Sequence, residues 1–135
     1  MTGKFITIEG IDGAGKTTQC RLLAAALRAR GVEVAETREP GGTPAAEAIR
    51  KLVLETEGLD AVEQALLMMA ARRSNVVQNV LPALSADRWV VQDRGPASTY
   101  AYQLYMQGIS YSWGNCGGLN TINNRSEERR VGKEC

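Results

Sequence analysis

The amino-terminal part of the chain contains the octapeptide Gly10-Ile11-Asp12-Gly13-Ala14-Gly15-Lys16-Thr17, which matches the pattern G-x-x-x-x-G-K-[ST]. An apolar, β-branched run at 4–9 precedes it, and apolar residues at helical spacing follow it over 17–30. A glycine-rich loop between a strand and a helix lets backbone N–H groups and the helix N-terminus face a phosphate. We therefore expect a phosphate-binding loop here. The flanking elements disfavour a chance match in which the glycines only form turns.

The segments around this loop predict an α/β fold. Gly31 ends the predicted helix, and a short apolar run at 32–36 completes a strand, helix and strand, which is one βαβ unit with a parallel sheet. Thr43 and Pro44 have the residue types of a helix N-cap and first helical position. The other elements expected are helices at 43–54 and 60–84, a third strand at 89–93 and the start of another helix at 98–107.

Composition limits the classes of partner and the chemistry. The chain of 135 residues has 16 Lys and Arg against 15 Asp and Glu, so its net charge of +1 does not indicate a nucleic-acid or anionic-lipid partner. It also contains no apolar run long enough to span a bilayer. From the net charge and the missing run together, we expect neither a nucleic-acid nor a membrane partner. The absence of histidine excludes imidazole bases, Ser-His-Asp triads and histidine-ligated metal sites.

Three cysteines, Cys20, Cys116 and Cys135, form no close pair. Their odd number argues against a disulfide framework or a zinc site and predicts a reducing, cytoplasmic location.

The character of the sequence changes after about residue 110. Residues 111–135 show neither helical nor strand periodicity, so we expect an incomplete domain at 1–110 followed by a non-native, disordered tail. Residues 125–135 are identified as the conceptual translation of a common short-read sequencing adapter. The alternative is a solvated charged tail.

Four motifs together carry a resemblance to a known family. They are the loop at 10–18, Arg38-Glu39-Pro40-Gly41-Gly42-Thr43, Ala70-Ala71-Arg72-Arg73, and Asp93-Arg94 followed by Ser98-Thr99-Tyr100-Ala101-Tyr102-Gln103. In this order and spacing the chain resembles bacterial thymidylate kinase over about 5–103. The resemblance implies a three-layer P-loop nucleoside-monophosphate kinase fold with a parallel sheet, truncated here before the lid and the last strands. The strand before the phosphate loop would then have an unpaired edge.

The resemblance also implies a transferase activity, namely phosphoryl transfer from MgATP to dTMP to give ADP and dTDP for dTTP biosynthesis, in a homodimer. The attacking phosphate oxygen is ionised near neutral pH, so no general base is required, and arginines and Mg²⁺ must neutralise two polyanions. Two alternatives stay open. One is an inactive nucleotide-binding fragment, and the other is a P-loop kinase for another small phosphoacceptor.

The resemblance assigns roles to individual residues. Lys16, Asp93 and Arg94 would be catalytic, and Thr17 and Asp93 would hold Mg²⁺ directly or through water. The ATP-binding residues would be Gly10, Ile11, Asp12, Gly13, Ala14, Gly15, Lys16, Thr17 and Thr18. The dTMP-binding residues would be Asp12, Arg38, Arg50, Met68, Arg72, Arg94, Thr99 and Gln103.

Within the dTMP set, Arg38 and Arg94 would grip the monophosphate with help from Arg50. Arg72 would meet the thymine edge, with polar contacts from Thr99 and Gln103. Taken singly, each of these arginines has the alternative of being a solvated surface residue.

Three further positions also carry alternatives. Asp12 would approach the sugar or the metal, or it is simply a turn residue, and Asp93 has the alternative of a helix N-cap. Met68 stands where the family usually has a phenylalanine that stacks on thymine. It either contacts the base or packs in the core of a long helix.

Overall fold

The structure is a computed structural model, and it describes residues 3–99, 109–111 and 119–121. Its centre is a parallel sheet of β1 (Phe5–Ile8), β2 (Val34–Arg38) and β3 (Trp89–Asp93) in the order β1-β3-β2. The register pairs Asp93 with Ile8 on one side and with Arg38 on the other. Parallel strands end at the same edge of a sheet, so this register brings three distant parts of the chain together there.

Strand β3 is the central strand, and its burial follows from its two neighbours. Val90 and Val91 are fully buried, whereas all four residues of β1 remain at least partly exposed. Within the described residues β1 pairs with β3 alone. The parallel sheet predicted from the sequence is confirmed, and so is the position of β1 at its edge.

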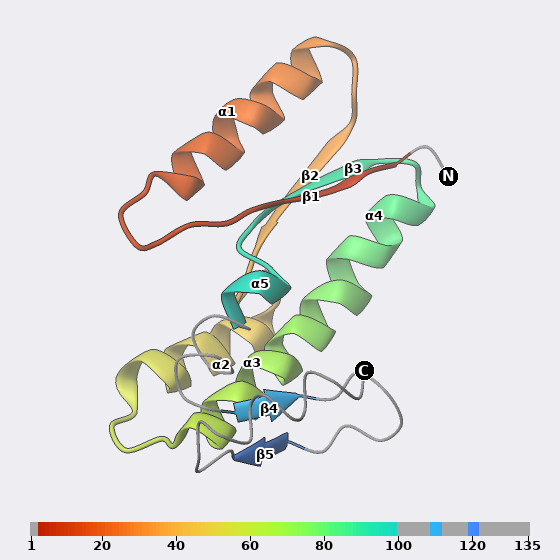
Figure 1. Cartoon of the computed structure of the whole chain (residues 1–135). Helices are drawn as coiled ribbons and strands as arrows, with labels where there is room; N and C mark the ends of the chain where they lie inside the picture. The colour runs from red at the N-terminus through yellow and green to blue at the C-terminus, as the bar shows by residue number, and fades with distance from the viewer. Residues whose placement is uncertain (1–2, 100–108, 112–118, 122–135) are drawn as a thin grey trace, which may run out of the picture.

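Helices cover both faces of this sheet, which makes three layers (Figure 1). Helix α1 (Lys16–Ala29) lies on one face and contacts β2 and β3. Helix α4 (Leu81–Ser85) lies on the other face, where Ala83 packs with Val80 and Val90 in a buried cluster. Alternate residues of a strand face opposite sides, so Val91 points toward the α1 layer.

The helix expected over 60–84 is one continuous helical rod, and its middle part is a π-helix. It consists of α3 (Ala61–Asn75), the π-helix η1 (Val76–Val80) and α4. Asp60 begins it with a capping box, in which Asp60 Oδ1 accepts from the Glu63 N–H at 2.7 Å and Glu63 Oε2 accepts from the Asp60 N–H at 2.8 Å. The π-helix was not predicted, because periodicity does not reveal a single wide turn.

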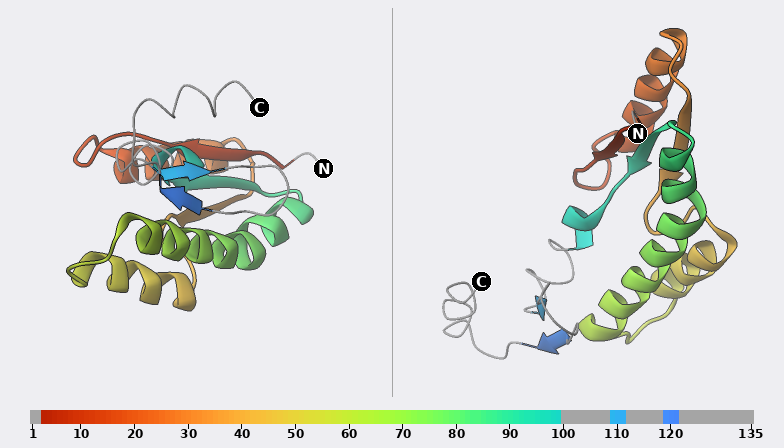
Figure 2. Two further views of the ribbon diagram at one scale, coloured as in Figure 1. Left: turned by 60° about the horizontal axis from the view of Figure 1, so that its bottom comes forward. Right: turned by 90° about the vertical axis from the view of Figure 1, so that its right-hand side faces the viewer.

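Helix α2 (Pro44–Glu55) lies beside α3 (Figure 2). Thr43 is its N-cap, with Oγ1 accepting from the Ala46 N–H at 3.1 Å, and Pro44 occupies the first turn. The expected start of this helix is therefore confirmed. Its position beside α3 sets the loop at 39–43 against the end of the sheet.

The last described elements are α5 (Pro96–Thr99) and the antiparallel pair β4 (Ile109–Tyr111) and β5 (Leu119–Thr121). The helix expected at 98–107 begins two residues earlier, and its part at 100–107 lies outside the described residues. Most of the predicted tail at 111–135 also lies outside them, so the boundary at residue 110 stays a prediction. Among the helices that the structure describes, none is both long and apolar enough to cross a membrane.

Candidate active site

The phosphate loop lies between β1 and α1, where the sequence predicts it. Gly13 and Gly15 have φ values of 78° and 82°, in the left-handed region that residues with side chains rarely adopt. Gly15 is the N-cap of α1, and no side chain in the described part of the chain caps this helix. The first N–H groups of a helix lack acceptors within it. These amides therefore suit an anion at the mouth of the loop.

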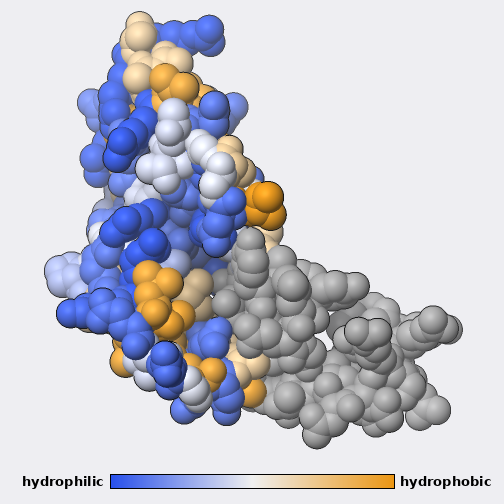
Figure 3. Space-filling view, turned by 90° about the vertical axis from the view of Figure 1, so that its left-hand side faces the viewer, coloured by the Kyte–Doolittle hydropathy of each residue, from blue (hydrophilic) through white to orange (hydrophobic). Residues whose placement is uncertain are grey.

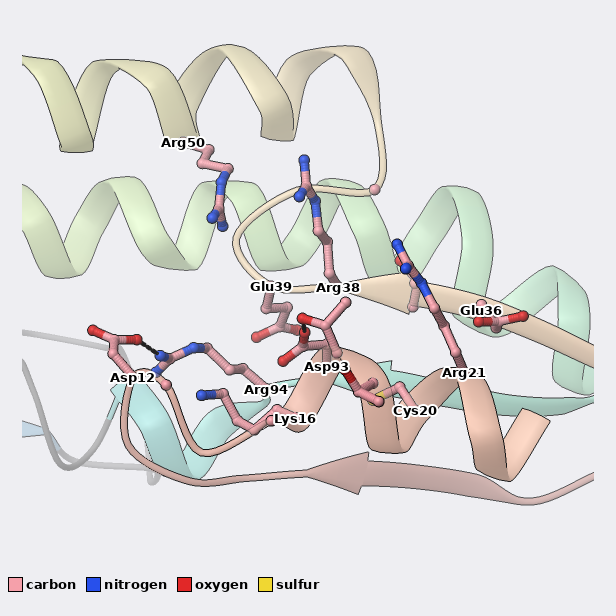
Figure 4. A pocket seen from close by; sticks show the side chains of 16 residues that line it. Asp12, Lys16, Cys20, Arg21, Glu36, Arg38, Glu39, Arg50, Asp93 and Arg94 are labelled. Atoms are coloured by element: carbon pink, nitrogen blue, oxygen red, sulfur yellow. Dashed lines mark hydrogen bonds and ion pairs between the residues drawn. The ribbon is translucent and has the colours of Figure 1, made fainter. Parts of the chain in front are cut away.

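Lys16 is held inside the curve of this loop. Its side chain is largely buried, and its Nζ donates a hydrogen bond of 2.7 Å to the Ile11 carbonyl oxygen. The ammonium group thus lies across the turn that the glycines form, near Arg94 and Asp12 (Figure 4). A cation in this place can meet a phosphate that the loop amides hold.

Thr17 and Asp93 bring two oxygen ligands together. Thr17 Oγ1, in the first turn of α1, donates a hydrogen bond of 2.6 Å to Asp93 Oδ2 at the end of β3. Helix α5 begins at Pro96, so Asp93 is not its N-cap, and that alternative for Asp93 is wrong.

The oxygens of Thr17 and Asp93 fit a hard divalent cation such as Mg²⁺. The described residues contain no group of three or more His, Cys, Asp or Glu that could hold a metal alone. Mg²⁺ is usually bound by only one or two protein carboxylates together with phosphate oxygens of a substrate, so this small set of protein ligands is compatible with it.

Arg94 turns toward the phosphate loop because its backbone is unusual. Its φ is 67°, in the left-handed region, and its N–H donates to the Ile8 carbonyl oxygen at 3.0 Å. Its guanidinium forms an ion pair with Asp12, whose side chain is almost fully exposed (Figure 4). The structure therefore places Asp12 at the rim of the site, as an ion-pair partner as well as a turn residue.

The end of β2 and helix α2 supply two further arginines, Arg38 and Arg50. Arg38 Nε and Nη2 donate to the two carboxylate oxygens of Glu47 at 3.1 and 2.8 Å, and Arg50 Nη1 donates to the Pro40 carbonyl at 3.1 Å. The hydrogen bond from Arg38, and then the one from the Gly42 N–H, lower the pKa of the Glu47 carboxyl. The same pair raises the pKa of Arg38. Sequence analysis did not identify Glu47.

These elements surround a cavity of about 670 Å³ (Figure 4). Its basic lining residues are Lys16, Arg21, Arg38, Arg50 and Arg94, and its acidic ones are Asp12, Glu36, Glu39 and Asp93. The predicted site residues that line it are Asp12, Gly13, Gly15, Lys16, Thr17, Thr18, Arg38, Arg50, Asp93 and Arg94. Five basic side chains thus meet at one cavity together with four acidic ones, although the net charge of the chain is only +1.

A smaller cavity of about 240 Å³ adjoins the first. Both cavities share four lining residues, namely Asp12, Glu39, Arg50 and Arg94. The smaller one adds an apolar wall of Pro40, Val53, Leu54 and Met68. Figure 3 shows one face of the molecule, which is largely hydrophilic with smaller hydrophobic areas. Met68 is half-buried and lines this cavity, so it does not lie in the fully buried hydrophobic core.

Arg72 contacts the buried carboxylate of Glu39. Its Nε donates to Glu39 Oε2 at 2.8 Å, and Glu39 is buried and lines both cavities, whereas Arg72 is not among the lining residues of either. Its contact with a base edge stays a prediction. The side chain of Thr99 and the whole of Gln103 lie outside the described residues.

The remaining loop residues shape the backbone. Gly10, Ile11 and Ala14 do not line the larger cavity, and the Ala14 N–H donates to the Ile11 carbonyl at 3.3 Å. Their predicted ATP contacts stay predictions.

Sequence analysis also gave no role to Glu39, which lines both cavities, or to Asn75 and Gln92, which are fully buried and line neither. A polar Gln92 inside an apolar strand was an available signal, whereas nothing in the local pattern singles out Asn75 on its helix.

Comparisons with known proteins identify the family. The thymidylate kinase family model matches residues 8–119. The thymidylate kinase of Rhizorhabdus wittichii is 55% identical over 111 residues, which are 81% of this chain and 53% of that protein. The thymidylate kinase of Nitrosospira multiformis is 51% identical over 111 residues, which are 82% of this chain and 54% of that protein.

A crystal structure of thymidylate kinase from Ehrlichia chaffeensis superposes on the chain with a TM-score of 0.76 at 46% identity. The match covers 82% of this chain and 60% of that one, and it confirms the P-loop nucleoside-monophosphate kinase fold. The chain spans about half the length of the curated relatives it matches. By the family match, the identities and the shared fold, the chain belongs to the thymidylate kinase family.

Proposed function

We propose that this chain carries the phosphate loop and phosphoacceptor site of an enzyme that transfers the γ-phosphoryl group of ATP to dTMP, giving ADP and dTDP. The observation that carries the proposal is the shape of one cavity. Lys16, Arg94 and the phosphate loop lie on one side of it, and Arg38 and Arg50 lie on the other. Two phosphate groups that meet between these sides would each find cations.

The chemistry needs position and charge more than proton transfer. A monophosphate oxygen is already ionised near neutral pH, so it can attack without a base. Lys16 would hold the donor phosphates, while Arg38 and Arg94 would hold the acceptor phosphate with bidentate guanidinium contacts. These side chains would offset the repulsion between two polyanions and stabilise the charge that develops during transfer.

A divalent cation, which we propose is Mg²⁺, would be held by Thr17 Oγ1 and the Asp93 carboxylate together with phosphate oxygens. Both protein oxygens already lie together at the mouth of the loop. Bound there, the ion would supply positive charge to the β- and γ-phosphate oxygens.

The smaller cavity would hold the base of dTMP. It continues from the arginine-lined cavity, and its apolar wall includes Met68, so a ring that extends from a bound phosphate would reach it. Contacts of Arg72, Thr99 and Gln103 with the base belong to the same proposal. The homodimeric state and the cytoplasmic location stay predictions.

The test uses the purified chain of residues 1–135 with MgATP and the monophosphates dTMP, dUMP, dGMP and dCMP. Calorimetry would measure binding, and chromatography of the products would measure transfer. The proposal expects dTMP to be preferred. Equal use of all four would favour another phosphoacceptor, and binding without turnover would favour a nucleotide-binding fragment.

A matched pair on α2 tests where the phosphate binds. Arg50→Ala should weaken dTMP binding because Arg50 lines both cavities. Lys51→Ala should leave it unchanged, because Lys51 is exposed and pairs with Glu55 at 3.9 Å. Equal effects of the two substitutions would contradict the proposed position of the monophosphate.

A further inference from the structure

Two amide side chains are completely buried behind the candidate site. Asn75 ends α3 and Gln92 lies in β3, and both have no exposed surface. Asn75 Nδ2 donates a hydrogen bond of 2.9 Å to Gln92 Oε1. A buried amide is costly unless it is hydrogen-bonded, so the further partners of this pair show what the pair holds in place.

One branch of the network leads to Arg94. Gln92 Nε2 donates to the Arg94 carbonyl oxygen at 2.9 Å, and the Arg94 N–H donates to Ile8 at 3.0 Å. Both backbone groups of Arg94 are thus held, and its φ is 67°. A left-handed conformation is unfavourable for a residue with a side chain, so it persists where the surroundings hold it. The Gln92 contact is one of these supports.

The other branch leads to the end of β2, where Arg38 lies, and to the loop at 39–43 that follows it. Asn75 Oδ1 accepts from Thr37 Oγ1 at 2.6 Å, one residue before Arg38. It also accepts from Asn79 Nδ2 at 2.9 Å, and Asn79 Nδ2 donates to the Gly42 carbonyl at 2.7 Å. A Cβ on Gly42 would lie 2.4 Å from Thr37 Oγ1 and 2.7 Å from Asn75 Oδ1. The loop therefore packs directly against the amides.

We propose that Asn75 is a positioning residue that holds Arg94, Arg38 and the loop at 39–43 in one arrangement for the monophosphate group. It does not line either cavity of the site and acts through its two neighbours. Its amide donates toward Gln92 and accepts from Thr37 and Asn79, so neither leucine nor a carboxylate can replace it on both sides. The inference rests on the proposed function, because it assumes that the arginines bind dTMP.

The first experiment measures the Kd of dTMP and of ATP by calorimetry for the chain of residues 1–135. Asn75→Leu and Gln92→Met should each weaken dTMP binding about tenfold and weaken ATP binding less, because the network reaches the phosphate loop only through the Arg94–Asp12 ion pair. Val80→Ala is the matched control. It removes buried volume from the same rod without touching the amides, so it should lower Tm and leave the Kd of dTMP unchanged.

The second experiment asks whether the effect passes through Arg94. If Gln92 acts by holding Arg94, Gln92→Met should cause no further loss of dTMP affinity in a chain that already carries Arg94→Ala. Additive losses would overturn the positioning role. Gln92→Met keeps the length of the side chain, so it tests this branch even if Asn75→Leu does not fold.

The outcomes separate the two proposals. If the unmodified chain binds ATP but not dTMP, the proposed function is wrong and the inference fails with it. If the unmodified chain binds dTMP and the folded Asn75 and Gln92 variants bind it equally well, the inference alone is overturned.

Discussion

The hydroxyl of Thr17 donates a hydrogen bond of 2.6 Å to Oδ2 of Asp93, although 76 positions separate the two residues. Parallel pairing explains the contact, because Asp93 lies beside Ile8 at the end of the strand that leads into the phosphate loop. One oxygen therefore comes from the first turn of a helix and one from the end of the central strand. The first prediction concerns what these two oxygens hold.

Asp93→Asn should raise the Mg²⁺ concentration needed for half-maximal ATP binding by about tenfold or more. The amide keeps an acceptor for Thr17 but loses the negative charge that attracts the cation. Calorimetric titrations of ATP at several MgCl₂ concentrations would measure this. Glu33→Gln removes an exposed carboxylate elsewhere and serves as the control. An unchanged Mg²⁺ dependence would show that Asp93 is not a metal ligand, direct or through water.

Lys16→Ala should reduce phosphoryl transfer by about 100-fold or more, because the transferring group loses a fixed cation in a pre-organised site. ATP binding should also weaken. Lys4→Ala is the matched control, since Lys4 lies before β1 and its Nζ is 5.1 Å from the centre of the Trp89 ring. Near-normal turnover of the Lys16 variant, measured as ADP release, would refute its proposed role.

Met68→Phe should lower the Kd of dTMP, because a rigid aromatic ring stacks on a base better than a flexible thioether does. The comparison variant is Leu66→Phe, which adds a ring at an exposed position on the same helix. Calorimetry with dTMP and thermal unfolding would be measured on both. An unchanged Kd with a lowered Tm would indicate that Met68 acts in packing.

The ion pair between Glu47 and Arg38 should make the free energy of unfolding depend on pH in the acidic range. Arg38 and the Gly42 N–H lower the pKa of Glu47 in the folded chain below its ordinary value of 4.5. The folded state therefore binds this proton less readily than the unfolded state. The stabilisation is complete above the ordinary pKa and is lost as pH falls through the lower, folded value.

Wild type and Glu47→Gln should accordingly differ most at pH 7, by no more than about 1 kcal/mol for so exposed a pair, and should converge as the pH falls through the lowered, folded-state pKa of Glu47. Urea denaturation at pH 7, 5, 4 and 3 would measure the difference. Glu55→Gln, whose ion pair with Lys51 is longer at 3.9 Å, should change stability less. A difference that grows as the pH falls would contradict the assignment.

Local sequence determined the parts of this protein whose conformation depends on near neighbours. The glycines of the phosphate loop, the cap at Thr43 and Pro44, and the long helical rod all follow from spacing within one element. The same is true of the three strands. Their β-branched runs and the helix between the first two predict a parallel sheet before any pairing is known.

Only the tertiary structure decided which of these parts meet. The order β1-β3-β2 places Asp93 between Ile8 and Arg38, and no local pattern encodes that neighbourhood. Met68 illustrates the same limit, since a methionine at helical spacing suits a core and a cavity wall equally well. Asn75 illustrates this limit as well, because its hydrogen-bond partners Thr37 and Gln92 lie far away in the sequence. Periodicity reports which face of an element is buried, whereas the identity of the partner depends on long-range packing.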